Sequence, residues 1–182
     1  MLNGVVKLLA VLLSLLLLFV YPLLESYQRQ DDIAMMTAYR SALHFVDTVR
    51  DKGVLTPDMY SDFTAELGLA GYEYVIEMEH YAKRYEPDYD DPLNESTFHE
   101  RFLIRYELTA HQDIVSVLFP EQPYSKDDPR RKYHMSIGDY IQLKIKPAQP
   151  LRSEMLIRWL SNSDESPQWS WSVGGMIRNE AA

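Results

Sequence analysis

The sequence predicts an α+β protein. An N-terminal transmembrane helix continues into an amphipathic helix, and a small, mostly antiparallel sheet with short helices follows. Three observations predict this fold: residues 1–25 are almost entirely apolar, residues 26–52 repeat apolar side chains with a helical period, and several later segments alternate apolar and polar side chains like strands. We therefore divide the chain into a membrane anchor (1–25) and an extracytoplasmic domain (26–182), the latter made of a stalk helix (26–52) and a head (53–182).

The anchor is predicted from a run without charge. Residues 8–24 contain ten leucines and no charged side chain. With the two valines before Lys7, the span is about 20 residues or ~30 Å of helix, which matches a bilayer core. We expect Leu8, Leu12, Leu16 and Phe19 to contact lipid. A cleaved signal peptide is the competing interpretation, but the run exceeds the usual length of about 7–15 residues and lacks a small-residue cleavage site. A buried core helix is disfavoured because the leucines occupy every side of the helix.

Charges on either side of the anchor predict its orientation. Lys7 and the amino terminus precede most of the run, whereas Glu25, Asp31 and Asp32 follow it. The positive end of a membrane helix is retained in the cytoplasm. We therefore expect a single-pass cell-membrane protein with a cytoplasmic N-terminus and an extracellular C-terminal domain.

The stalk is predicted to be an amphipathic helix that continues from the anchor, with a bend at Pro22. Its packing face follows alternating steps of four and three residues through Met35, Tyr39, Ala42, Val46 and Val49. Gly53 supplies the residue that ends the helix. A wide apolar face just outside a bilayer requires a cover, which is either the chain's own sheet or the helices of sister subunits.

The head is predicted to hold a further helix, about four strands and two short helices. Thr56-Pro57-Asp58 combines a capping hydroxyl, a proline at the first position and an acid in the first turn, so it predicts a helix start. The expected strands are residues 72–79, 102–108, 140–146 and 169–173, and the expected short helices are residues 112–119 and 151–160. Polar loops are expected at residues 86–97 and 124–132.

Composition excludes several classes of function. The formal net charge is -9, whereas nucleic-acid binding depends on clustered lysine and arginine. The chain has no cysteine, which excludes disulfides, thiolate catalysis and cysteine-ligated zinc. No G-x-S-x-G, phosphate-binding glycine loop or H-E-x-x-H occurs in the sequence. We therefore expect no enzymatic activity, no cofactor and no metal site.

Local patterns that suggest ligands have simpler explanations. Glu77 and Glu79 lie near His80, but on a strand the two acids point away from the histidine, which favours a solvated strand edge. The acidic segment 86–95 offers oxygen ligands for Ca²⁺ but lacks the sixth-position glycine of an EF-hand. Trp169 and Trp171 share one side of a predicted strand, where core packing is favoured over stacking on a sugar. The basic segment 130–132 is interpreted as exposed loop charge.

Four segments carry a family resemblance: FVDTVRDKGVLTPDMYSDF, LAGYEYVIEMEH, IGDYIQLKIK and VGGMIRNE. They resemble single-pass membrane proteins of Firmicutes associated with tight-adherence (Tad) type IV pilus loci, including TadE-like and minor pilin-like components. A membrane helix that runs into an amphipathic helix covered by a small sheet is also the plan of pilin-type subunits. The resemblance implies a structural role, with the lipid bilayer and other pilin-like or pilus-assembly subunits as partners.

One departure from the pilin pattern bears on this role. Type IV prepilins are cleaved after a glycine before the apolar run and carry glutamate five residues further on. Gly4 is present here, but Leu9 occupies the glutamate position. This departure argues against prepilin processing and favours a minor or assembly role. The alternative function is a membrane-anchored extracellular module that binds a cell-wall sugar, a peptide or calcium.

Overall fold

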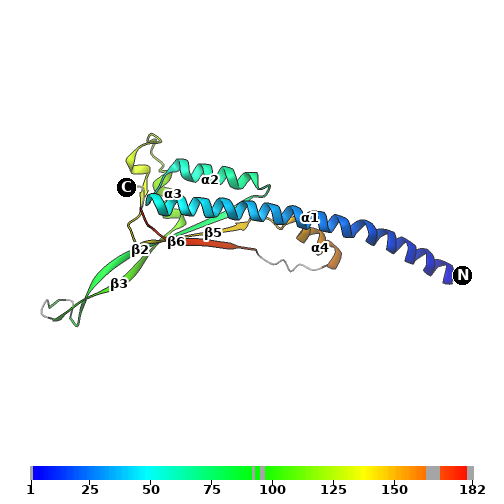
Figure 1. Cartoon of the computed structure of the whole chain (residues 1–182), viewed down its shortest axis with the longest axis horizontal. Coiled ribbons are helices and arrows are strands. Elements are labelled where there is room, and N and C mark those ends of the chain that lie inside the picture. The colour runs from blue at the N-terminus through cyan, green and yellow to red at the C-terminus, as the bar shows by residue number, and fades with distance from the viewer. Residues whose placement is uncertain (1, 92, 95–96, 163–168, 180–182) are drawn as a thin grey trace.

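One long helix organises the structure. In the computed structural model, which describes residues 2–91, 93–94, 97–162 and 169–179, α1 (Leu2–Lys52) is a single helix of 51 residues. Its N-terminal half projects from the molecule and its C-terminal half lies along a sheet (Figure 1). Pro22 lies within the helix, where it removes one backbone hydrogen-bond donor without ending the helix. The predicted continuation of the anchor into the stalk is confirmed.

The other elements form the head around the C-terminal half of α1. They are β1 (Val54–Leu55), α2 (Pro57–Leu69), β2 (Tyr74–Tyr89), β3 (Phe98–Ala110), α3 (His111–Leu118), the 3-10 helix η2 (Pro129–Arg131), β4 (Tyr133–His134), β5 (Tyr140–Pro147), α4 (Arg152–Ser161) and β6 (Trp171–Met176). This arrangement of a long apolar helix, a small antiparallel sheet and short helices confirms the predicted α+β class.

The main sheet places its core-facing residues in rows. Among the described residues its strand order is β3-β2-β5-β6, and each neighbouring pair is antiparallel. Met78 lies opposite Leu143, which in turn lies opposite Val173, and directly opposed side chains point to the same face of a sheet. Ile141, Leu143 and Ile145 are buried, so the predicted inward face of this strand is confirmed.

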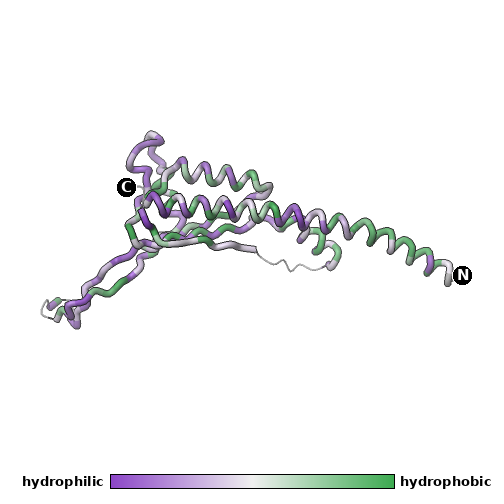
Figure 2. Tube along the Cα trace, in the orientation of Figure 1, coloured by the Kyte–Doolittle hydropathy of each residue, from purple (hydrophilic) through white to green (hydrophobic). Residues whose placement is uncertain are grey.

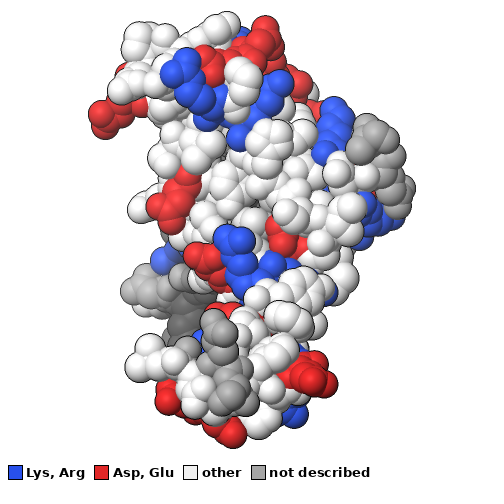
Figure 3. Space-filling view, turned by 90° about the vertical axis from the view of Figure 1, so that its left-hand side faces the viewer, with Lys and Arg blue, Asp and Glu red and all other residues white. Residues whose placement is uncertain are grey.

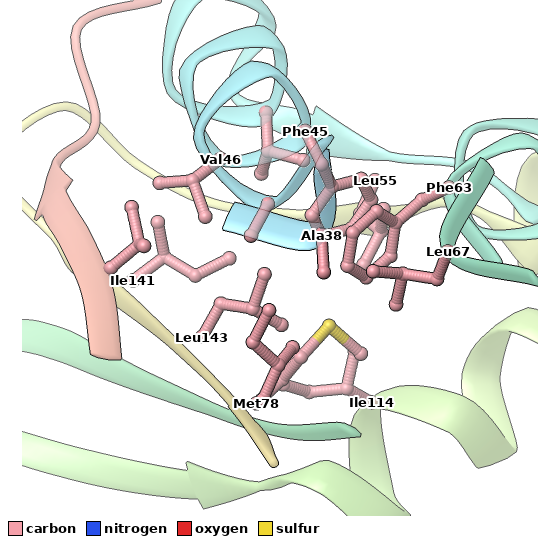
Figure 4. Packing of buried hydrophobic residues seen from close by; sticks show 14 of the residues in the cluster. Ala38, Phe45, Val46, Leu55, Phe63, Leu67, Met78, Ile114, Ile141 and Leu143 are labelled. Carbon is pink, nitrogen blue, oxygen red and sulfur yellow. The ribbon is translucent and has the colours of Figure 1, made fainter. Parts of the chain in front are cut away.

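The hydrophobic core lies between α1 and the sheet, and α2 closes one side of it. Phe45 of α1 stacks on Phe63 of α2 with ring centroids 4.3 Å apart, and Val46 points toward Ile141 and Leu143 (Figure 4). Burial of each such side chain stabilises the fold by about 1.5–3 kcal/mol. The chain's own sheet and α2 therefore cover the stalk face, which is one of the two covers that the sequence allows.

Local signals set the ends of the first two helices as predicted. The Thr56 side chain accepts a hydrogen bond from the Met59 backbone N–H at 3.3 Å and starts α2. Gly53 follows α1 with a φ of 61°, a left-handed conformation that glycine adopts without a steric penalty.

Several predicted strand boundaries are wrong, and two of them change where a loop or turn lies. β2 continues to Tyr89, so the first part of the predicted loop 86–97 is strand, and Glu86 pairs there with Leu103. β6 continues through Gly174 and Gly175 and does not end before them. A Cβ at Gly174 would lie 2.7 Å from the Ile141 carbonyl oxygen. The glycine therefore permits a close approach between strands and does not terminate β6.

Candidate interaction surface

The predicted anchor residues lie on the projecting half of α1. The exposed fractions of Leu8, Leu12, Leu16 and Phe19 are between 54% and 74%. By length and composition α1 is able to cross a membrane, and the rest of the described chain does not bury its most apolar stretch. In Figure 2 most of this half is coloured as hydrophobic. It is a candidate membrane anchor.

The buried stripe of the stalk differs from the predicted packing face at two positions. Ala42, Val46 and Val49 are buried as expected, whereas Met35 is only half-buried and Tyr39 remains 39% exposed. Ala34 and Ala38 take the buried positions instead. Met35 and Tyr39 are the larger apolar side chains in the sequence pattern, but the small side chains of Ala34 and Ala38 take the buried positions and allow the head to lie close to the helix.

The β2–β3 hairpin extends past the rest of the sheet. β5 pairs with β2 over residues 74–81, whereas residues 82–89 of β2 pair with β3 alone. Figure 1 shows this part of the hairpin pointing away from the helices. Both of its faces are therefore open to their surroundings.

One face of the projecting hairpin is mostly apolar, with Lys83 opposite Tyr106 as its charged residue. The register places Tyr85 opposite Ile104, and their neighbours on the same face include Phe102, Tyr106 and Leu108. These five residues, which we term the hairpin apolar face, are between 49% and 61% exposed. The sequence correctly predicts that positions 102–108 alternate as a strand. The tertiary structure, however, leaves the apolar side of that strand uncovered.

The opposite face of the hairpin carries cross-strand ion pairs. Arg84 pairs with Glu107 at 2.9 Å and Arg105 pairs with Glu86 at 2.7 Å. Exposed pairs of this kind stabilise a protein by about 0–1 kcal/mol each. They give the two faces opposite chemical character, so a partner meets either charge or apolar surface depending on the side it approaches.

A buried polar network holds the root of the hairpin. His80 bonds to the Tyr133 hydroxyl through Nδ1 at 2.8 Å and to Asp139 through Nε2 at 3.0 Å. Asp139 also accepts hydrogen bonds from the backbone N–H groups of Lys83 and Ser136, at 2.8 and 2.7 Å. The expectation of a solvated strand edge at His80 is wrong, because this side chain is 4% exposed. Since both ring nitrogens are already bonded, the imidazole has a structural role.

Opposing effects determine the pKa of the buried carboxyl in this network. Burial raises the pKa of Asp139, but the hydrogen bonds from Lys83, Ser136 and His80 together outweigh burial and hold that pKa below its ordinary value. Burial also raises the pKa of the Tyr133 hydroxyl. The network thus keeps a carboxylate charged inside the fold, fixing the loop before β5 to the hairpin.

The other candidate ligand residues are already paired within the chain. Asp88 pairs with Arg101 at 2.5 Å, and the Asp90 carboxylate lies 3.0 Å from His99 Nε2, so two acids of the segment 86–95 already have partners within the chain. Glu95 of that segment lies outside the described residues. Within the part of the chain that the structure describes, no three His, Asp or Glu side chains are placed to hold a metal ion.

The basic segment and the tryptophan pair also have local explanations. Hydrogen bonds from Arg130 lower the pKa of Asp128 to about 2, and Arg131 donates to the Leu118 carbonyl at 2.9 Å. Trp171 packs against the core at the start of β6, whereas Trp169 precedes the strand and is 47% exposed. The expectation that both indoles share one strand is therefore wrong.

Surface charge and sheet topology further define the hairpin surface. On the end of the molecule away from the N-terminus, acidic and basic side chains are interspersed among uncharged ones (Figure 3). β3 lies at the edge of the main sheet, and edge strands present backbone groups that can pair with another chain.

Comparisons with models of known families, with curated proteins and with solved structures gave no match.

Proposed function

We propose that this protein is a non-enzymatic, membrane-anchored, pilin-like component that takes part in assembling a Tad-type pilus or secretion machine on a Gram-positive cell. The N-terminal half of α1 spans the cell membrane, with its N-terminus in the cytoplasm and the head outside. The partners are the lipid bilayer and other pilin-like or pilus-assembly subunits, and nucleic acid is not among them.

The observation that carries this proposal is the division of α1 into two halves. Residues Val5–Phe19 expose large apolar side chains on all sides, whereas Ala38, Ala42 and Val49 are fully buried beneath the main sheet. A single rigid helix thus links a lipid-soluble segment to a folded head. This connection matches the plan of pilin-type subunits that the resemblance implies.

The hairpin apolar face supports a role in contacts between subunits. Its five residues form a contiguous apolar strip on a projecting edge hairpin. An exposed apolar strip of this kind marks an interaction surface, because water solvates it poorly. The buried network at the root of the hairpin gives the strip a defined orientation relative to the head.

The test is recovery of pilus-assembly subunits with the tagged full-length protein from detergent-solubilised host membranes. The variant Phe102→Ser/Ile104→Ser removes apolar surface from the hairpin face. We expect it to reduce recovery of the partner subunits by about tenfold or more, since two interface anchors commonly contribute over 1 kcal/mol each.

A matched control separates lost contact from lost folding. Leu69 is 85% exposed at the end of α2, away from the hairpin, so Leu69→Ser removes a similar side chain from another surface. This control should recover partners as the unmodified protein does. If the hairpin variant recovers as many partner subunits as the unmodified protein, the hairpin apolar face is not the contact surface. If the unmodified protein recovers no pilus subunits, the proposed function itself is contradicted.

A further inference from the structure

The start of α4 is fixed beside α1 just beyond the predicted membrane span. The Ser153 backbone N–H donates to Asp31 Oδ2 at 2.8 Å, and Arg152 bonds to Gln30 at 3.2 Å. Asp31 is 1% exposed and also accepts a hydrogen bond from the Tyr72 hydroxyl. The carboxylate therefore satisfies a backbone donor at the N-terminus of α4 and holds that terminus against α1.

From this point α4 runs back along α1 toward the N-terminus. The two helices pack together, and Figure 1 shows α4 on the N-terminal side of the head, beside α1. Val20, Leu24 and Tyr27 are half-buried, whereas their neighbours are exposed. Together with Asp31 they are spaced by four, three and four residues, so they lie on one side of α1. This is the side on which α4 begins.

Helix geometry gives the level that α4 reaches. α4 has 10 residues, so it is about 15 Å long and covers about ten residues of an antiparallel neighbour. A helix that starts beside Asp31 therefore ends near the level of Val20 and Tyr21. That level is about 6 Å inside the apolar span that ends at Leu24.

The exposed large side chains of α4 are apolar and lie on more than one side of the helix, and Arg158 between them is half-buried. Trp159 is 76% exposed, and Met155, Ile157 and Leu160 are between 42% and 52% exposed. Figure 2 shows the hydrophobic residues of α4 next to the hydrophobic half of α1. In water these four side chains would be exposed apolar surface, but in the outer leaflet they would contact acyl chains. Tryptophan is enriched at this interface.

We propose that α4 is a second membrane-embedded element, whose C-terminal half (157–160) lies in the outer leaflet against α1. This inference rests on the membrane anchor of the proposed function. It follows that the head is seated on the bilayer at α4 and does not stand away from it on a bare stalk. The occupant of the apolar surface is lipid, and the hairpin remains free at the other end of the head.

The absence of native cysteines allows a direct test. Full-length single-cysteine variants Leu160→Cys and Ile157→Cys are labelled with an environment-sensitive fluorophore and reconstituted in phosphatidylcholine–phosphatidylglycerol vesicles. Lipids spin-labelled near the headgroup are then added as quenchers. Leu12→Cys serves as the label inside the anchor and Leu69→Cys as the label in water.

We expect the labels at 160 and 157 to show blue-shifted emission and lipid quenching several-fold above that at 69. Water-like, unquenched labels at 160 and 157 beside a quenched label at 12 would overturn the inference and leave the anchor intact. Blue-shifted labels without lipid quenching would also overturn it, because a protein would then cover α4. An unquenched label at 12 would contradict the anchor and, with it, both proposals.

Discussion

The two halves of α1 share one helix but have opposite surroundings. In the N-terminal half apolar side chains occur on every side and are exposed, whereas in the C-terminal half one stripe of alanine, valine and phenylalanine is buried. Both halves are α-helical, and only Pro22 lacks its backbone hydrogen-bond donor, so secondary structure does not distinguish them. The difference shows that the distribution of apolar side chains around a helix, rather than their number alone, decides whether the rest of the chain covers it.

The strongest test of this comparison places a carboxylate in each half. Val46 is 1% exposed, so Val46→Asp buries an unpaired charge and should destabilise the head by more than about 4 kcal/mol. Leu12→Asp should leave unfolding of the head unchanged but disfavour membrane insertion by about 2.5–3.5 kcal/mol. Chemical unfolding monitored by circular dichroism and membrane fractionation measure the two effects. If the head of Val46→Asp still unfolds cooperatively with unchanged stability, burial of the stripe would not distinguish the C-terminal half of α1 from the N-terminal half.

The boundary between the halves can be tested at two adjacent acids. Asp31→Ala leaves the Ser153 N–H and the Tyr72 hydroxyl without their buried acceptor, which should cost about 2–3 kcal/mol of unfolding free energy. Asp32 is exposed, so Asp32→Ala should change stability by less than about 0.5 kcal/mol. Urea unfolding of both variants gives the difference. Equal effects would mean that Asp31 does not fasten α4 to α1.

The main sheet covers the C-terminal half of α1, and hydrogen bonds of Asp139 connect this sheet to the loop before β5. We expect Asp139→Asn to destabilise the head by about 1–3 kcal/mol at neutral pH, because the amide cannot accept all the hydrogen bonds that the carboxylate accepts. The folded-state pKa of Asp139 lies below the ordinary 3.8. The stability that the charge supplies is therefore complete above that value and is lost as the pH falls through the lower folded-state pKa.

Unfolding of the wild type and of Asp139→Asn across this pH range checks both the sign and the size of the effect. The difference in unfolding free energy between the two proteins should narrow as the pH falls below about 4. A difference that widened with acidification would show that the carboxylate is not the stabilised form.

The smallest expected effect concerns α2, which flanks the covered half of α1. Thr56→Ala removes the hydroxyl that accepts from the Met59 N–H and should cost about 1 kcal/mol. Thr56→Ser keeps the acceptor and should retain most of the stability. A thermal unfolding series measures both variants, and equal losses in the two would assign the effect to the threonine methyl group instead of the cap.

Sequence alone determined the features that depend on neighbours in the chain. The charge-free run, the helical period of the stalk, the Thr56 cap, the Gly53 terminus and the alternation of residues 140–146 all predicted the observed elements, because each is encoded within a few residues. The candidate interaction surface was predicted only in part. The strand at 102–108 was found, but its lack of cover was not.

Only the tertiary structure decided which apolar faces are covered. Residues 102–108 and 140–146 have the same alternating pattern, yet the strand register turns the apolar side of the first away from α1 and the apolar side of the second toward it. Likewise, Asp31 and Asp32 look equivalent in sequence, but only Asp31 meets Tyr72 and Ser153. These outcomes depend on contacts between segments far apart in the chain, because burial is a property of the assembled layers and no single segment encodes it.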